Sequence, residues 1–179
     1  MGWGAIGLSC VSGDPPPIAS ISPPGSTPTG DTATPPATCA TAEAELQVGT
    51  GVDTFQLLED LDEVELVFGP QGGYHITIAV RACHMASPLT LHIEIFDELS
   101  SVAVSDVGYL AATLDVGDCC GERVDMPGFL DTSAVPGIGD QDPGSYLDGK
   151  EVSIVLSATD ELGNEASDTV QVIARSLSR

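Results

Sequence analysis

Carboxylates at regular spacing before a predicted strand form a candidate calcium site. Counted from Asp140 as the first place of a twelve-residue EF-hand-like loop, Asp142, Asp148 and Glu151 occupy the third, ninth and twelfth places, where calcium ligands lie. The glycine required at the sixth place is replaced by Ser145, and Glu151 begins the predicted strand. The alternative is therefore a solvated acidic loop without an ion. Calcium is the cofactor that this segment brings into consideration.

Histidine and sulfur side chains offer a second kind of metal chemistry. Cys83, His84 and Met85 carry the thiolate, imidazole and thioether groups that bind copper. Neighbours on a strand point to opposite faces, however, so consecutive residues do not converge on one ion. His75 and His92 fall on the outward faces of what we expect to be adjacent strands. There they are surface residues or, as a weaker hypothesis, a two-histidine patch.

The five cysteines predict an oxidising compartment if they pair. With Cys10 set aside for another use, Cys39, Cys83, Cys119 and Cys120 form two disulfides in one of three connectivities. A bond between the adjacent Cys119 and Cys120 is strained. We therefore expect each of these two to pair with either Cys39 or Cys83, in an order that the sequence leaves open.

Catalytic motifs are not evident in the sequence. It contains no nucleophile elbow, zincin helix, phosphate loop or dinucleotide fingerprint. A hydrolase remains an alternative, with its site in the long segment 117–149.

The chain has 27 acidic residues against 5 basic ones. Nucleic acid is therefore excluded as a partner, because binding it requires Lys and Arg to neutralise phosphates, and an anionic lipid surface is excluded on similar grounds.

Short segments of alternating polarity predict that residues 43–179 form an all-β domain. In Tyr74–Cys83, Ile76, Ile78 and Val80 share one face, and Leu89–Ile95 repeats this pattern. Such alternation is typical of antiparallel strands with one buried face. Seven to nine strands with turns between them predict an immunoglobulin-like β-sandwich. The other predicted strands are Ala44–Val48, Glu63–Leu66, Val102–Ser105, Tyr109–Leu114, Val152–Ala158 and Thr169–Ala174.

Two segments of this domain resemble known families. Leu147–Ala174, with the turn Ala158–Ala166 between the last two predicted strands, resembles the closing hairpin of bacterial immunoglobulin-like modules. The sequence GPQGG at 69–73, with His75 after it, is similar to a motif of exported bacterial lipoproteins of unknown function. Physically, Gly69–Gly73 is a tight connection between strands. The alternative is a ligand-contacting loop that uses Gln71, Gly72, Gly73 and His75.

The N-terminal part of the chain differs sharply in composition. Residues 1–10 are apolar and small, and Gly7–Cys10 resembles a bacterial lipobox, which implies that Cys10 is lipidated. No run of residues is long enough to predict a transmembrane helix. Residues 11–42 hold Pro, Ser and Thr with few large hydrophobic side chains, and Val11–Thr38 contains eight of the thirteen prolines. This composition predicts an extended, semi-rigid linker.

Together these features predict a non-enzymatic lipoprotein of the cell envelope that presents an immunoglobulin-like binding or structural module. We expect it at the periplasmic or outer-membrane face, or secreted, with membrane contact only through the lipid anchor. The expected partner is a protein or glycan at the cell surface. The alternatives are a calcium-binding extracellular domain and the hydrolase.

Overall fold

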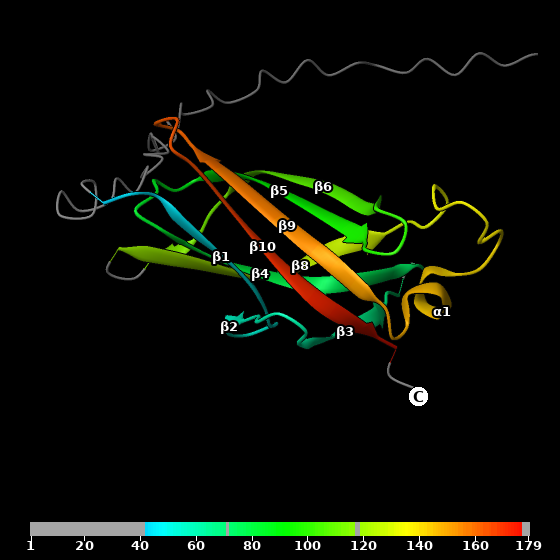
Figure 1. Cartoon of the computed structure of the whole chain (residues 1–179). Coiled ribbons are helices and arrows are strands. Elements are labelled where there is room, and N and C mark those ends of the chain that lie inside the picture. Colours follow the sequence, from blue (N-terminus) through cyan, green and yellow to red (C-terminus); the bar gives the residue numbers. More distant parts are fainter. Residues whose placement is uncertain (1–41, 71, 117–118, 177–179) are drawn as a thin grey trace, which may run out of the picture. The chain divides into compact units, whose positions relative to one another are not determined.

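The computed structural model describes residues 42–70, 72–116 and 119–176, which form an all-β fold with one short helix (Figure 1). In this part of the chain ten strands join into one mixed sheet, and eight of them are longer than two residues. The elements are β1 (Glu45–Thr50), β2 (Gln56–Leu57), β3 (Glu63–Phe68), β4 (Tyr74–Cys83), β5 (Leu89–Asp97), β6 (Val102–Ala112), β7 (Asp115–Val116), β8 (Cys120–Leu130), α1 (Pro143–Leu147), β9 (Glu151–Asp160) and β10 (Glu165–Arg175).

Strand β3 makes the sheet continuous by pairing with both of its halves. In the first half, β4 pairs with β8 on one edge, and with β1 and then β3 on the other. In the second half, β3 runs parallel to β10, and antiparallel β9, β5 and β6 follow in that order. The Tyr109 hydroxyl of β6 also donates to the Pro127 carbonyl of β8 at 2.7 Å. The sheet therefore curls and encloses its core.

The predicted strand faces are confirmed in the core. Ile76, Ile78 and Val80 of β4 are fully buried, and so are the apolar residues of β5 and β9 that alternate with polar ones. These residues belong to one continuous apolar cluster between the two halves of the sheet. Burial of Val, Ile and Leu stabilises the fold by about 1.5–3 kcal/mol per side chain. Tyr146 is the one aromatic residue among the buried members of this cluster in the described chain, in keeping with the 4% of Phe, Trp and Tyr in the sequence.

The prediction that 117–149 is one long insertion is wrong, because β8 occupies its first part. This strand pairs with β4 from Tyr74–Leu130 to Cys83–Cys120. Its period is broken by a register shift near Asp125, which has a positive φ of 56°. In addition, Pro127 and Gly128 are residue types that are typical of turns. A Cβ at Gly128 would meet the Ile95 side chain at 2.9 Å, so glycine permits close packing of the two halves here.

Two smaller differences concern element boundaries. The segments predicted as separate strands at 102–105 and 109–114 form the single strand β6, with register shifts against β5. The structure also contains α1, a single turn that starts at Pro143 after the N-cap residue Asp142. No helix in the described ranges is long and apolar enough to cross a membrane.

Candidate functional site

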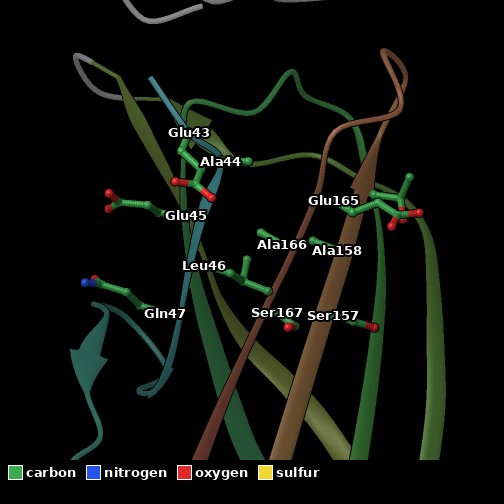
Figure 2. Close-up of a pocket in the computed structure, with 11 residues that line it drawn as sticks. Glu43, Ala44, Glu45, Leu46, Gln47, Ser157, Ala158, Glu165, Ala166 and Ser167 are labelled. Atoms are coloured by element: carbon green, nitrogen blue, oxygen red, sulfur yellow. The ribbon is translucent and has the colours of Figure 1, made fainter. Parts of the chain in front are cut away.

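A groove opens between β1 and β10, beside β9 (Figure 2). The Val48 amide of β1 donates to Asp168 Oδ2 of β10 at 2.8 Å, which joins the two strands at one point. Toward the start of both strands they separate and leave a volume of about 760 Å³ open to solvent. The lining residues are Glu43, Ala44, Glu45, Leu46, Gln47, Ser157, Ala158, Thr159, Glu165, Ala166 and Ser167.

The groove has an apolar floor and an acidic rim. Leu46 and Ala158 belong to the buried core, and Ala166 packs against that core. Glu45 and Glu165 are exposed on the strands at either side, and Glu43 precedes β1. All lining residues are neutral or acidic. The site is therefore suited to a ligand with apolar groups on one side and positive charge on the other.

Asp160 holds the loops at this end of the fold together. Its carboxylate accepts hydrogen bonds from the Leu162 and Asn164 amides at 2.9 and 2.8 Å, inside the β9–β10 turn. It also accepts the Ala86 amide of the β4–β5 loop at 3.0 Å and the Asn164 side chain at 2.8 Å. Burial alone would raise the pKa of the Asp160 carboxyl, but these hydrogen bonds outweigh it and lower the pKa below its ordinary value. The turn is therefore fixed by an ionised carboxylate.

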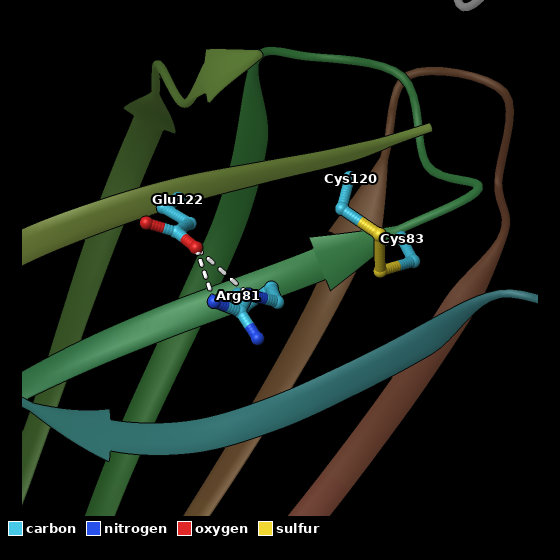
Figure 3. Close-up of polar contacts among 4 residues, drawn as sticks. All are labelled: Arg81, Cys83, Cys120 and Glu122. Carbon is cyan, nitrogen blue, oxygen red and sulfur yellow. Dashed lines mark hydrogen bonds and ion pairs between the residues drawn. A yellow bond between two sulfur atoms is a disulfide. The ribbon is translucent and has the colours of Figure 1, made fainter. Parts of the chain in front are cut away.

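A disulfide and an ion pair tie β4 to β8 near the same end (Figure 3). Cys83 is bonded to Cys120, its direct partner in the ladder. Because Cys120 is bonded to Cys83, the expectation that Cys119 and Cys120 do not pair with each other is confirmed. Cys119 is disulfide-bonded as well. Cys10 and Cys39 lie outside the described residues. Two residues before Cys83, Arg81 Nε and Nη2 donate to Glu122 Oε1 at 2.8 and 2.5 Å.

The disulfide removes the copper hypothesis, because Cys83 has no free thiolate. The two-histidine patch is also wrong, since β4 and β5 are not neighbours in the sheet. His92 Nε2 lies 2.6 Å from Asp106 Oδ1 on β6. His75 lies instead against Phe129 of β8, with ring centroids 6.1 Å apart.

The predicted binding loop at 69–73 has the geometry of a tight hairpin connection. The Gly69 amide donates to the Gly73 carbonyl at 2.9 Å, and the Gly72 amide donates to the Gly69 carbonyl at 3.0 Å. Gly72 and Gly73 have φ values of 83° and 95°, which glycine adopts without strain. Gln71 lies outside the described residues. The structural interpretation of this motif accounts for its glycines.

The acidic segment 140–151 is used for capping hydrogen bonds. Asp142 Oδ1 accepts the Ser145 amide at 3.0 Å at the start of α1. Asp148 Oδ1 accepts the Ser176 amide at 2.8 Å, and Glu151 begins β9. Asp140 is exposed. Within the described ranges, no three His, Cys, Asp or Glu side chains form a group able to hold a metal ion.

Sequence reasoning missed a buried polar cluster at the far end of β5. Asp97 is fully buried, and its Oδ2 accepts the Tyr146 hydroxyl at 2.9 Å and the Ser100 hydroxyl at 2.5 Å. Burial would raise the pKa of Asp97, but the bonds from Ser100 and Tyr146 and the nearby Lys150 charge lower it. Lys150 Nζ lies 3.1 Å from the Tyr146 ring centroid. The cluster fixes α1 against β5 and β9.

Lining residues of the groove were also missed as a set, since they come from segments more than a hundred residues apart. Their alternation in β1 and β10 is visible in the sequence, but the position of these two strands beside each other is not. Comparison of the chain with known protein families, with curated proteins and with solved structures gives no match.

Proposed function

We propose that the chain is a non-enzymatic, lipid-anchored module of the cell envelope with an immunoglobulin-like sandwich that binds a partner. The observation that carries the proposed sandwich is the strand order, and the proposed lipid anchor rests on the resemblance of Gly7–Cys10 to a lipobox. One half of the sheet runs β7-β8-β4-β1 and the other β3-β10-β9-β5-β6. Immunoglobulin domains have four strands in the order ABED and three in the order CFG, with extra strands beyond C in variable types.

The assignment of strands follows the chain order of that fold. In the proposed assignment, A, B and C correspond to β1, β4 and β5, and E, F and G correspond to β8, β9 and β10. The additional strand beyond C is β6. The short β7 then takes the place of D, next to β8. The closing β9–β10 hairpin is the part of the sequence that resembles bacterial immunoglobulin-like modules. This resemblance supports a binding or structural role for the module.

The distribution of charge supports a partner that carries positive charge. Four of the five basic residues lie in the described part, and each is engaged within the fold. Arg81 and Arg175 pair with Glu122 and Glu63, and Lys150 lies over Tyr146. The fourth, Arg123, donates to the Thr113 carbonyl at 3.4 Å. The surface therefore presents unbalanced carboxylates, which disfavour anionic partners.

Export and anchoring are tested by mass and by location. The full reading frame is expressed in a Gram-negative host, beside a Cys10→Ala variant, and the membrane and soluble fractions are separated. We expect the parent protein in the membrane fraction, with Cys10 as its lipidated first residue and a mass gain on reduction equal to two disulfides. We expect the variant without lipid. An unmodified chain in the cytoplasm with free thiols would refute the proposal.

A further inference from the structure

The start of β1 and the start of β10 present unpaired backbone edges to each other. In β1, the Val48 amide points away from β4 to Asp168, and its carbonyl accepts the Leu58 amide. Strand backbones alternate, so Leu46 and Ala44 direct their amide and carbonyl groups to the same side. No ladder joins this side of β1 to β10 in the described chain. These groups therefore form an open strand edge.

Strand β10 has the matching edge. The Gln171 carbonyl accepts the Leu61 amide, and the Ile173 amide donates to the Asp62 carbonyl, both on the side away from β9. By the same alternation, Ser167 and Glu165 direct their backbone groups toward β1. Both rows lie along the groove, and Figure 2 shows β1 on one side and β10 on the other. Since β1 and β3 are both antiparallel to β4, and β3 is parallel to β10, β1 and β10 run in the same direction.

Asp168 occupies the closed end of this groove in place of direct strand pairing. Its Oδ2 accepts the Val48 amide and its Oδ1 accepts the Thr169 amide at 2.9 Å. Paired strands lie about 4.8 Å apart, and a carboxylate inserted between two strands holds them farther apart. At the open end no ladder joins the two strands in the described chain, and backbone hydrogen-bonding groups lie on both walls of the groove.

The side chains around the groove define which strand would fit. Odd-numbered residues of both strands, among them Glu45 and Glu165, face outward, and even-numbered ones, among them Leu46 and Ala166, face inward. A strand placed between them would meet apolar side chains with one face and carboxylates with the other. Alternating apolar and basic residues satisfy both faces.

We propose that the groove binds an extended peptide of alternating apolar and basic residues, which adds as a strand between β1 and β10. This inference rests on the proposed binding function and names the class of its ligand. The peptide backbone pairs with Ala44 and Leu46 on one wall and with Glu165 and Ser167 on the other. Its inward side chains rest on Leu46, Ala158 and Ala166, and its Lys or Arg side chains reach the outer glutamates. Addition to open strand edges is an established form of peptide recognition.

The test measures binding of a fluorescent Val-Lys-Val-Lys-Val-Lys peptide to the full chain by anisotropy. Three peptides serve as controls: the same composition in two blocks, the Val-Glu alternating sequence, and the Val-Lys sequence with alternate backbone amides methylated. We expect binding of the unmodified alternating peptide, and a loss of at least tenfold in affinity for each control. Equal binding of the methylated peptide would show charge attraction only and would overturn the proposal.

Matched protein variants locate the site. We expect Glu45→Lys combined with Glu165→Lys to lower the affinity at least tenfold, and Ser167→Pro, which removes one amide of the open edge, to lower it severalfold. Glu151→Lys makes the same charge change as each of these single glutamate replacements, at the other end of β9, and should leave the affinity within twofold. An equal loss in Glu151→Lys, or no binding of the Val-Lys peptide at millimolar concentration, would overturn the proposal.

Backbone hydrogen exchange supplies a second measurement that does not depend on charge. Bound peptide should slow exchange at the Leu46 and Ser167 amides and leave the Ile78 amide, deep in β4, unchanged. Binding without protection at the two groove amides would overturn strand addition. The fractionation experiment above is independent of these results. A lipidated, envelope-located chain that fails to bind the peptide retains the proposed location and class and loses only this ligand assignment.

Discussion

Replacement of Asp160 by Asn should destabilise the fold and weaken the contact between the β9–β10 turn and the β4–β5 loop at the groove end. In the native structure this carboxylate accepts hydrogen bonds from Ala86, Leu162 and Asn164, and it is almost completely buried. Asn offers one acceptor oxygen and places an NH₂ group where the other oxygen was. At Oδ2, this NH₂ would face the Ala86 amide and the Asn164 side-chain amide, which are both donors.

The expected cost follows from the bonds that are lost. Hydrogen bonds to a charged group contribute about 1.5–3 kcal/mol each, and a buried donor left unpaired costs about 1–3 kcal/mol. Two bonds are lost in Asp160→Asn, and their effects are not additive because Asn164 can turn toward solvent. We therefore expect a decrease of about 2–4 kcal/mol in the free energy of unfolding. Chemical denaturation at neutral pH measures it. Glu161→Gln, an exposed neighbour in the same turn, should change it by less than about 0.5 kcal/mol.

The pH dependence separates a charge effect from a packing effect. Because the pKa of Asp160 is lowered in the folded chain, its contribution is present above its unfolded pKa and is lost as pH falls through the folded one. The difference in stability between the parent and Asp160→Asn should therefore be constant from neutral pH to about pH 5 and shrink below about pH 4. A difference that is small at neutral pH, or that stays constant into acid, would refute the reasoning.

Three further changes test the rest of the fold by chemical denaturation. Joint replacement of Cys83 and Cys120 by Ala should cost about 4 kcal/mol, because their bond closes a loop with a sequence separation of 37; no change would contradict this. Tyr146→Phe should cost about 1–3 kcal/mol, since the buried Asp97 carboxylate loses a donor; an unchanged midpoint would argue against that bond. Gly128→Ala should cost about 1–3 kcal/mol by overpacking against β5, and a stabilised variant would show spare room.

Strands with regular alternation were predictable, and strands with bends were not. The bounds of β4 were predicted correctly because Ile76, Ile78 and Val80 alternate without interruption beside polar neighbours. β8 was missed because its bulge at Asp125 shifts the period and its Pro127 and Gly128 resemble a turn. What makes β8 a strand is its neighbour β4, which supplies a ladder along its length. Such tertiary support has no signal in the local sequence.

Sites that combine strands distant in the sequence could not be predicted, for a related reason. The sequence predicts a calcium site from four acidic residues that are close together, namely Asp140, Asp142, Asp148 and Glu151. In the structure, the hydrogen bond of Asp142 is a short-range helix cap. The groove instead combines β1 with β9 and β10, and the sequence alone does not say which strands become neighbours. Asp160 was visible only as part of a turn motif. Its bond to Ala86, seventy-four residues away, explains why a carboxylate is needed there.

Asp160 and Asp168 show how this acidic chain uses its charges at the groove end. Each carboxylate accepts backbone amides from two segments that no ladder joins: Asp160 links a hairpin to a distant loop, and Asp168 links β1 to β10. Carboxylates are suited to this because they accept several bonds and donate none. A carboxylate between strands also keeps them apart, whereas an apolar residue would allow them to close. The same residue type therefore fixes both walls of the groove, and the glutamates on its rim make the groove acidic.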